Sequence, residues 1–323
     1  MKKILIFKTD RLGDLLNISP IINNLKLNYP TSSITLICSE YNKSIANYYH
    51  NDVKLIVFKK PIIFFLLKNI KFIFFNNYDF IFQLDGKNHS YLTSILIRAK
   101  KKVCIRFIKS KKILGMLMFI KRPNFLINYF FDEQEISYEN YNIDNNSDYH
   151  YLSLYLNLLK KLNIKIFTKN HYLPFNKAKK ISNFKDGYYL IHIDKRWEQF
   201  PATVSINLKE KLLTLSKSSN IVISSNIGGN KVFKFLNNEL LNKPNIEIIN
   251  NPNLNDTISL IFNSKYCVSS HSGLIVHTAA AFNKKIIDIV SKDIFNELDR
   301  WTPFNINYKR IDINNFVEYN FEI

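Results

Sequence analysis

The sequence predicts an α/β protein of two domains, each built on a parallel sheet that helices cover on both faces. Short apolar runs of strand length alternate with segments of helical periodicity, the pattern of βαβ units. The alternation stops near residue 170 and then starts again. A length of 323 residues suits two domains, and 46% hydrophobic residues are enough for two cores.

In the first half, five apolar runs predict strands: Lys3–Lys8, Ser33–Cys38, Val53–Phe58, Tyr78–Leu84 and Lys102–Phe107. Helical spacing predicts helices after the turn 9–14, over Asn42–Tyr49 and over Tyr151–Leu162. The apolar region Pro61–Phe82 contains charged and amide side chains, so its uninterrupted pieces are much shorter than the ~20 residues of a membrane span. It predicts a helix followed by a strand.

Two segments lack periodicity. Asp132–Asp148 is acidic and rich in Asn, which predicts a loop, and Asn170–Gly187 is the candidate linker between the domains. The second half repeats the first, with predicted strands at Tyr188–Ile193, Asn220–Ser224, Asn245–Ile249, Lys265–Ser269 and Lys285–Val290.

The turn Ser269–Gly273 separates one of these strands from an Ala-rich helical segment that contains Ala279–Ala281. In a strand–turn–helix unit of a parallel sheet, the backbone N–H groups that open the helix point into the crevice at the carboxyl end of the strand. This turn therefore predicts a phosphate site. The chain has no G-x-G-x-x-G and no P-loop sequence, which weakens a simple NAD or kinase interpretation.

The three cysteines, Cys38, Cys104 and Cys267, lie in apolar runs without metal-site spacing. We expect buried thiols in a reducing compartment, and therefore a cytoplasmic protein. The apolar run at the N-terminus is interrupted at Lys8, too soon for a secretion signal.

The formal net charge of +19 is unevenly distributed, because no acidic residue lies between Asp85 and Asp132. Basic residues from Lys87 to Arg122 flank the apolar segment Ile113–Ile120, a combination that favours an anionic membrane surface. A nucleic acid and a solvated basic face are the alternatives. We expect the membrane partner and no nucleic acid.

Three short motifs occur along the chain. The first is Arg11-Leu12-Gly13-Asp14 followed by Leu16 and Pro20, the second is Asp194-Lys195-Arg196-Trp197, and the third joins Ser272-Gly273 to His277 and Ala279–Ala281. Together they resemble the R-x-G-D-x-L-x-x-x-P, D-K-x-W and S/T-G-x-x-H-x-A-A-A signatures of glycosyltransferase family 9, the heptosyltransferases of bacterial lipopolysaccharide synthesis. Family members commonly have Asp where this chain has His271, which implies an altered contact with the donor sugar.

The resemblance implies the GT-B architecture, in which two Rossmann-like domains with parallel sheets face one another across a cleft. Residues 1–170 would form the acceptor-binding domain and residues 171–323 the nucleotide-sugar-binding domain, and the final segment is a candidate to pack back on the first. The implied activity is inverting transfer of a heptose or related sugar from a nucleotide-diphosphate donor, such as ADP-heptose, to a lipid-linked or lipopolysaccharide-core acceptor. The implied location is peripheral, at the cytoplasmic face of the inner membrane.

Inverting transfer requires a base on the acceptor side and positive potential beside the leaving group. The resemblance assigns the base to Asp14 and acceptor contacts to Arg11 and Gly13. The donor phosphates and sugar are assigned to Lys195, Arg196, His271, Ser272, Gly273, Leu274 and His277. These groups can neutralise the diphosphate without a metal, so we expect no metal and no other cofactor.

Each assignment has a structural alternative. Asp14 is also a suitable N-cap for the following helix, Arg11 can simply pair with an acid, Lys195 can be a solvated loop residue, and His277 can have a packing role. For the whole chain, the alternative is a catalytically degenerate GT-B-like module that binds a nucleotide sugar or an anionic glycolipid.

Overall fold

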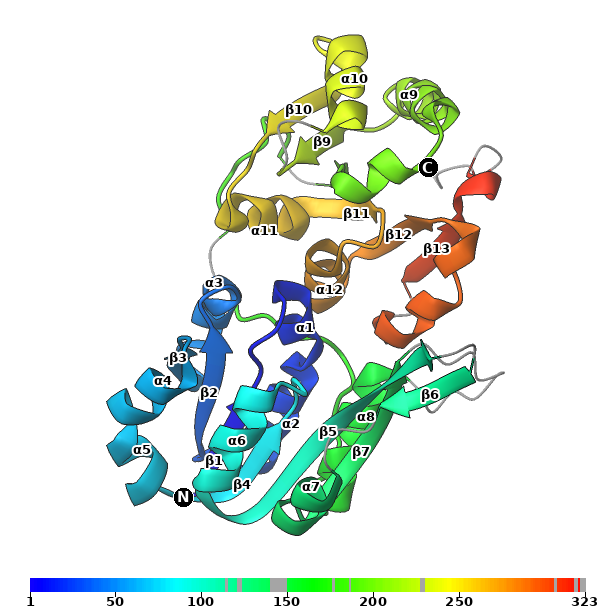
Figure 1. Cartoon of the computed structure of the whole chain (residues 1–323). Coiled ribbons are helices and arrows are strands. Elements are labelled where there is room, and N and C mark those ends of the chain that lie inside the picture. The colour runs from blue at the N-terminus through cyan, green and yellow to red at the C-terminus, as the bar shows by residue number, and fades with distance from the viewer. Residues whose placement is uncertain are drawn as a thin grey trace. The chain divides into compact units, whose positions relative to one another are not determined.

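The computed structural model describes residues 1–113, 116–120, 124–139, 150–175, 178–185, 187–226, 230–304, 307–316 and 319. The chain divides into two compact units, Met1–Lys169 and Asn170–Ile323 (Figure 1). Each unit contains one largely parallel sheet with helices packed against it. The α/β class with two Rossmann-like sheets is therefore confirmed.

The first unit contains a seven-stranded sheet. Its strands are β1 (Lys3–Phe7), β2 (Ser33–Ser39), β3 (Val53–Phe58), β4 (Asn77–Gln83), β5 (Arg98–Ile113), β6 (Met116–Ile120) and β7 (Glu133–Glu139). Its helices are α1 (Leu12–Asn17), α2 (Ser19–Asn28), α3 (Lys43–Ala46), α4 (Ile62–Lys68), α5 (Ile70–Phe75), α6 (Asn88–Leu96), α7 (Asn124–Phe130) and α8 (Tyr151–Lys161).

The strand order in the first sheet is β3-β2-β1-β4-β5-β6, with β7 paired to β5. All pairs are parallel except β5 with β6. After β1 the chain moves to one side of the sheet, and from β4 onward it builds the other side. The order therefore reverses between β1 and β4, and in such sheets ligands bind beyond the carboxyl ends of the strands at that switch point.

The loop predicted over Asp132–Asp148 is wrong in its first part, because Glu133–Glu139 forms β7 in parallel register with Val103–Lys109 of β5. Residues 140–149 lie outside the described part of the chain. The polar sequence of β7 reflects its place at the sheet edge, where burial on both faces is not required.

The basic stretch from Lys87 to Arg122 is partly neutralised within the protein. Lys100 pairs with Asp79 at 2.9 Å, and Lys101 pairs with Asp132 at 3.0 Å. Arg106 is buried, and its Nη1 donates to Gln134 Oε1. The side chains of residues 109–126 lie outside the described part, so the predicted docking role of this stretch is untested.

The second unit repeats the architecture with six parallel strands in the order β10-β9-β8-β11-β12-β13. These strands are β8 (Tyr188–His192), β9 (Ile221–Ser225), β10 (Ile246–Asn250), β11 (Ser264–Ser269), β12 (Lys285–Val290) and β13 (Tyr308–Asp312). The helices are α9 (Ala202–Leu215), α10 (Lys231–Leu240), α11 (Leu254–Asn263) and α12 (Gly273–Ala281). Here the order reverses between β8 and β11.

The alternation of side chains along β8 fills both faces of the second sheet. Tyr189 and Ile191 belong to the core shared with α9 and α10, whereas Tyr188 and Leu190 belong to the core shared with α11 and α12. Successive strand residues point to opposite faces, so a strand covered on both sides is apolar throughout. This is why the strand pattern could be read from the sequence.

The packing of the final segment on the first unit stays a prediction, because residues 317–318 and 320–323 lie outside the described part of the chain. β13, which the sequence analysis did not identify, pairs in parallel with β12, and the fully buried Phe316 joins the core of the second unit. The candidate linker contains no helix or strand in its described residues, 170–175, 178–185 and 187.

Candidate active site

A buried lysine fixes the turn that follows β1. The side chain of Lys8 is 1% exposed, and its Nζ donates to Asp10 Oδ2 at 2.9 Å, to Tyr155 Oη at 2.9 Å and to the Leu84 carbonyl at 3.0 Å. An ammonium group has three donors, and three acceptors meet them here. Burial acts to lower the pKa of Lys8, but Asp10 and Tyr155 raise it well above its ordinary value. Lys8 therefore supplies a fixed positive charge beside the turn.

Asp10 is the group in this turn that the sequence analysis missed. Burial raises the pKa of Asp10 to about 7 against the attraction of Lys8, and the neighbouring carboxylates of Asp14 and Asp85 raise it further. The sequence signal was available, since Asp10 lies in the turn directly after a buried strand. The carboxyl ends of parallel strands are where such side chains converge.

Asp14 is the third residue of α1, and Arg11 occupies the N-cap position. The Oδ2 atom of Asp14 accepts a bond from the Arg11 backbone N–H at 3.3 Å. Asp14 thus contributes to the helix start from inside the first turn rather than as the N-cap, so the N-cap alternative is wrong in its position. Its carboxylate is half-buried and the Arg11 side chain is exposed, while Gly13 lies between them in the same turn.

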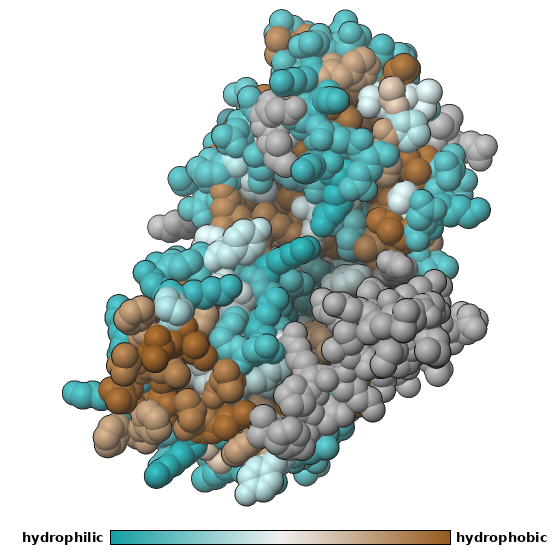
Figure 2. All heavy atoms as spheres, viewed as in Figure 1, coloured by the Kyte–Doolittle hydropathy of each residue, from teal (hydrophilic) through white to brown (hydrophobic). Residues whose placement is uncertain are grey.

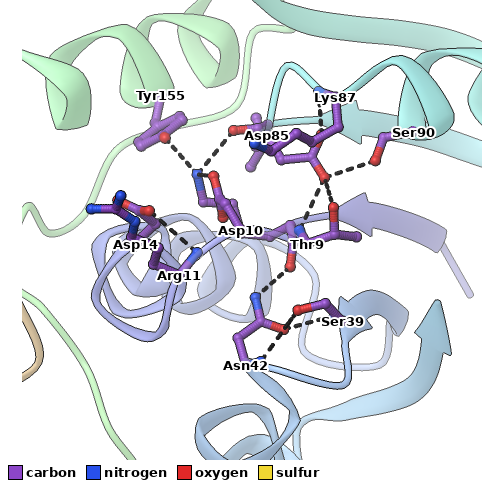
Figure 3. Close-up of polar contacts among 12 residues, drawn as sticks. Thr9, Asp10, Arg11, Asp14, Ser39, Asn42, Asp85, Lys87, Ser90 and Tyr155 are labelled. Carbon is purple, nitrogen blue, oxygen red and sulfur yellow. Dashed lines mark hydrogen bonds and ion pairs between the residues drawn. The ribbon is translucent and has the colours of Figure 1, made fainter. Parts of the chain in front are cut away.

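Asp85, at the carboxyl end of β4, joins the two strands of the first switch point (Figure 3). Its Oδ2 accepts from the Thr9 N–H at 2.9 Å, from Thr9 Oγ1 at 2.6 Å and from Ser90 Oγ at 2.7 Å. Its Oδ1 accepts from Gln83 Nε2 at 2.8 Å and from the Lys87 N–H at 3.0 Å. Five bonds to one buried carboxylate fix the backbone of the turn that carries Asp14.

An open pocket of about 420 Å³ lies at this edge of the sheet. It is lined by Thr9, Ser39, Glu40, Tyr41, Phe58, Lys59, Lys60 and His89. The His89 ring stacks on Phe58 with centroids 4.0 Å apart, and its Nε2 lies 2.9 Å from Thr9 Oγ1. Burial lowers the pKa of His89, so the imidazole is biased toward its neutral form.

In the second unit, the motif that begins at Asp194 follows β8 and forms a 3₁₀ turn over Lys195–Gln199. Trp197 closes this turn, because its indole is 1% exposed and Nε1 donates to the His192 carbonyl at 3.0 Å. Trp197 therefore packs in the core of the second unit, and its ring is not exposed to stack on a ligand. Burial raises the pKa of Asp194, and Arg196 opposes that shift. The Lys195 side chain is exposed.

Arg196 connects this motif directly to the turn after β11. Its N–H donates to Asp194 Oδ1 at 3.0 Å, and its Nη1 donates to the backbone carbonyl of His271. The two motifs are 75 residues apart in sequence and meet here through one guanidinium. The predicted donor-binding residues Arg196 and His271, which come from separate signatures, therefore lie together at the switch point between β8 and β11.

Asp288 fixes the turn between β11 and α12 through His271. The sequence analysis did not identify this residue. This fully buried carboxylate on β12 accepts from the His271 backbone N–H through Oδ1. Its Oδ2 lies 2.9 Å from His271 Nδ1 and accepts from Tyr308 Oη at 2.7 Å. His271 adopts a φ of 48°, in the left-handed region that is unfavourable for a residue with a side chain. The bonds to Asp288 stabilise that conformation.

Helix α12 begins directly after this turn, with Ser272 as N-cap and Gly273 as first residue. The Ser272 side chain makes no capping bond, and the N–H groups at a helix start have no partner within the helix. Those of Gly273 and Leu274 are therefore suited to an anion. His277 lies one turn further along, 3% exposed, with its ring stacked on His171 at 4.9 Å between centroids. That burial favours the packing alternative for His277.

The three cysteines are free and buried, as the sequence predicts. Among the described residues, no helix is long and apolar enough to cross a membrane, and no group of three or more His, Cys, Asp or Glu side chains is arranged to hold a metal ion.

The solved structures that are similar to the whole chain include three transferases. E. coli heptosyltransferase WaaC with ADP has a TM-score of 0.70 at 16% identity, over 98% of this chain and 96% of that one. Glycosyl transferase family 9 from Veillonella parvula DSM 2008 has a TM-score of 0.69 at 13% identity, over 99% and 90%. E. coli ADP-heptose lps heptosyltransferase II has a TM-score of 0.65 at 13% identity, over 96% and 90%.

Neither a protein-family model nor a curated protein sequence matches the chain. At these identities the structural similarity establishes the fold shared with these transferases. Function has to be argued from the residues of the site.

Proposed function

We propose that the chain is an inverting glycosyltransferase, heptosyltransferase-like and related to glycosyltransferase family 9. It would move a heptose or related sugar from a nucleotide-diphosphate donor to a lipopolysaccharide-core or other cell-envelope glycan. The observation that carries this proposal is the position of the three motifs. Arg11–Asp14 follows β1, Asp194–Arg196 follows β8, and His271–Leu274 follows β11. Each motif lies at the switch point of its sheet, where this fold binds ligands.

In the proposed reaction, a hydroxyl oxygen of the acceptor attacks the anomeric carbon of the donor sugar. Asp14 accepts the hydroxyl proton as the new carbon–oxygen bond forms. The bond between that carbon and the β-phosphate oxygen breaks, and the nucleoside diphosphate leaves with the electron pair. Because attack occurs opposite the leaving group, the anomeric configuration inverts.

The leaving diphosphate gains negative charge, so the second unit must stabilise an anion. Lys195 and Arg196 supply positive charge, and the N–H groups of Ser272, Gly273 and Leu274 supply backbone donors. The contact between Arg196 and the His271 carbonyl keeps the side chains of the second motif next to the helix N–H groups of the third. This supports the assignment of both motifs to the diphosphate. His271 is the candidate contact to the rest of the donor, whereas the predicted donor contact of His277 is less favoured because its buried ring stacks on His171.

We infer an ADP-heptose-like donor. Two structures with this fold are described with ADP or as ADP-heptose enzymes, which supports an adenine nucleotide. His271 stands where the family commonly has Asp, so the sugar contact would differ. On the acceptor side, Arg11 and Gly13 precede Asp14 in the same turn, and the pocket lysines Lys59 and Lys60 suit an anionic glycan.

The proposed location is the cytoplasmic face of the inner membrane, where the protein would be peripheral and would meet a lipid-linked acceptor. The proposal includes no metal and no other cofactor, because Lys195, Arg196 and the helix N–H groups would stabilise the charge of the leaving group. It also includes no nucleic-acid partner.

The test is product analysis with a panel of nucleotide sugars, with and without a membrane glycolipid extract. We expect one donor to release its nucleoside diphosphate only when acceptor is present, with the sugar recovered on the glycolipid in inverted configuration. Tight donor binding without release for every acceptor would support the degenerate module instead. Affinity for DNA or RNA that persists at moderate salt would favour a nucleic-acid function.

A further inference from the structure

Helices α4 and α5 are apolar on both faces. Toward the sheet, Phe65 and Ile73 are buried in the core of the first unit with Leu5 and Phe7 of β1. Toward solvent, the same two helices carry a second set of large apolar side chains. A surface helix normally presents polar residues on its outer face, so an apolar outer face indicates a second contact.

We define the α4–α5 patch by its six exposed side chains: Ile63, Phe64, Leu67, Ile70, Phe74 and Phe75. The most exposed are Phe75 at 82%, Phe64 at 66% and Leu67 at 61%. Figure 2 shows a continuous hydrophobic area at the lower left of the view, where Figure 1 places α4 and α5. Single exposed apolar residues are normal, but a contiguous patch marks an interaction site.

The charge around the patch is entirely basic in the local sequence. Between Val53 and Tyr78 there are five lysines and no acidic residue: Lys54, Lys59, Lys60, Lys68 and Lys71. All five side chains are exposed. Lys59 pairs with Glu40 at 2.9 Å, whereas Lys68 and Lys71 lie within the two helices that form the patch. Aromatic and aliphatic groups flanked by lysines match the interface of an anionic bilayer.

We propose that the α4–α5 patch docks the first unit on an anionic phospholipid surface, with Phe64 and Phe75 entering the interface and Lys68 and Lys71 contacting the headgroups. Helices α4 and α5 have seven and six residues, so they are too short to span a bilayer and would lie in its interface. A second copy of the chain fits less well, because a two-fold contact through this patch brings the like-charged lysines together. A nucleic acid fits less well, because bases can stack on the phenyl rings but leave the aliphatic side chains of Ile63, Leu67 and Ile70 without an apolar partner.

This inference deepens the proposed function, because it assigns the membrane contact to a surface apart from the proposed catalytic residues. The patch is also continuous in sequence with the acceptor-side pocket, since Lys59 and Lys60 immediately precede the residues that open α4. A glycolipid head group would then be offered close to the carboxyl edge of the first sheet. The docking test requires neither donor nor turnover, so its outcome is independent of the transferase proposal.

The experiment is co-sedimentation of the full chain with vesicles of phosphatidylglycerol and phosphatidylethanolamine, compared with phosphatidylcholine alone. The wild-type protein is expected to bind the anionic vesicles and to be released partly by salt. Phe64→Ser with Phe75→Ser should lower the partition coefficient at least tenfold. Each lysine at an anionic surface strengthens binding about fivefold, so Lys68→Gln with Lys71→Gln should lower it about 25-fold at low salt.

The matched control is Tyr129→Ser with Leu241→Ser, which removes exposed apolar side chains of 82% and 55% exposure outside the patch. This control should bind like wild type, and all variants should keep the wild-type melting temperature because the replaced side chains are exposed. Brominated lipid should quench the fluorescence of the tryptophan introduced by Phe75→Trp, whereas it should not quench that of the tryptophan introduced by Tyr129→Trp.

Three results would overturn the proposal. The first is unchanged vesicle binding in the Phe64 and Phe75 variant. The second is loss of binding only when Lys109, Lys111 and Lys112 are changed to Glu, which would assign docking to the other basic stretch. The third is a concentration-dependent dimer in sedimentation velocity that the Phe64 and Phe75 variant abolishes.

Discussion

At the scale of single residues, the two halves of the candidate site share one device, a buried carboxylate that fixes a turn. Asp85 receives five hydrogen bonds in the first unit, and Asp288 receives three contacts in the second. Neither residue was predicted, because a lone acid within or after an apolar strand gives no sign of which backbone it will meet. Motif residues such as Asp14 and Lys195 were identified because a family pattern names them.

Asp288→Asn should destabilise the second unit. An amide offers one acceptor oxygen and turns an N–H₂ group toward donors, so at least one buried donor loses its partner at a cost of about 1–3 kcal/mol. Tyr308→Phe removes two hydrogen bonds, the one to Asp288 and the one that Tyr308 Oη accepts from Arg310 Nε at 3.2 Å, and should cost about 2 kcal/mol. Urea unfolding monitored by circular dichroism measures both. A cost well below about 1 kcal/mol for Asp288→Asn would contradict the account of Asp288.

Asp10 predicts a pH dependence of stability. Its pKa is about 7 in the folded chain against an ordinary value of 3.8, so the folded state binds this proton more tightly. Protonation of Asp10 therefore adds to the free energy of unfolding. This contribution is fully present below about pH 4 and is lost as the pH rises toward 7. The unfolding free energy of Asp10→Asn, measured relative to wild type, should therefore rise from pH 4 to 7 and then stay constant. A difference that does not vary with pH would contradict this.

At the scale of elements, the sequence predicted strands with apolar runs, including the edge strands β3 and β10, and missed the more polar strands β7 and β13. β8 and β9 are buried at every residue, and β11 is buried at every residue except Lys265. β7 and β13 are edge strands with mixed polar sequences, and their pairing depends on partners far along the chain. Propensity alone rarely identifies such strands. The paired helices α4 and α5 were predicted as one helix, and their exposed outer face was visible only in three dimensions.

The start of α12 allows a test of its backbone donors. Ser272 has extended backbone angles, φ −74° and ψ 105°, which a following proline accepts, and proline is favoured at the first helical position. Gly273→Pro should therefore keep the helix and remove one N–H. We expect nucleoside-diphosphate affinity to fall about tenfold or more, as a lost bond to a charged group implies.

Gly273→Ala is the matched control, because it adds a side-chain carbon and keeps the N–H. Calorimetric titration with a nucleoside diphosphate and with the nucleoside alone separates the phosphate contact from other contacts. Equal affinities of the Pro and Ala variants for the diphosphate would show that this N–H does not bind the phosphates.

At the scale of the whole molecule, the repeated βαβ pattern predicted two parallel sheets. In each sheet the strand order reverses once, between β1 and β4 in the first and between β8 and β11 in the second. That topology explains why motifs spread from Arg11 to His277 lie at corresponding places in two units. It also separates what sequence can provide from what it cannot. The motifs and strands are local, whereas Asp288, the Arg196–His271 contact and the α4–α5 patch depend on tertiary packing.

The central claim is sugar transfer with Asp14 as the base, and single-turnover kinetics of Asp14→Asn with the best donor and a glycolipid acceptor tests it most directly. Removing a general base typically lowers the rate about 10²–10⁴-fold. We predict a loss in this range, with donor affinity within a few fold of wild type because the donor contacts are assigned to the second unit. Unchanged turnover in Asp14→Asn would contradict the claim.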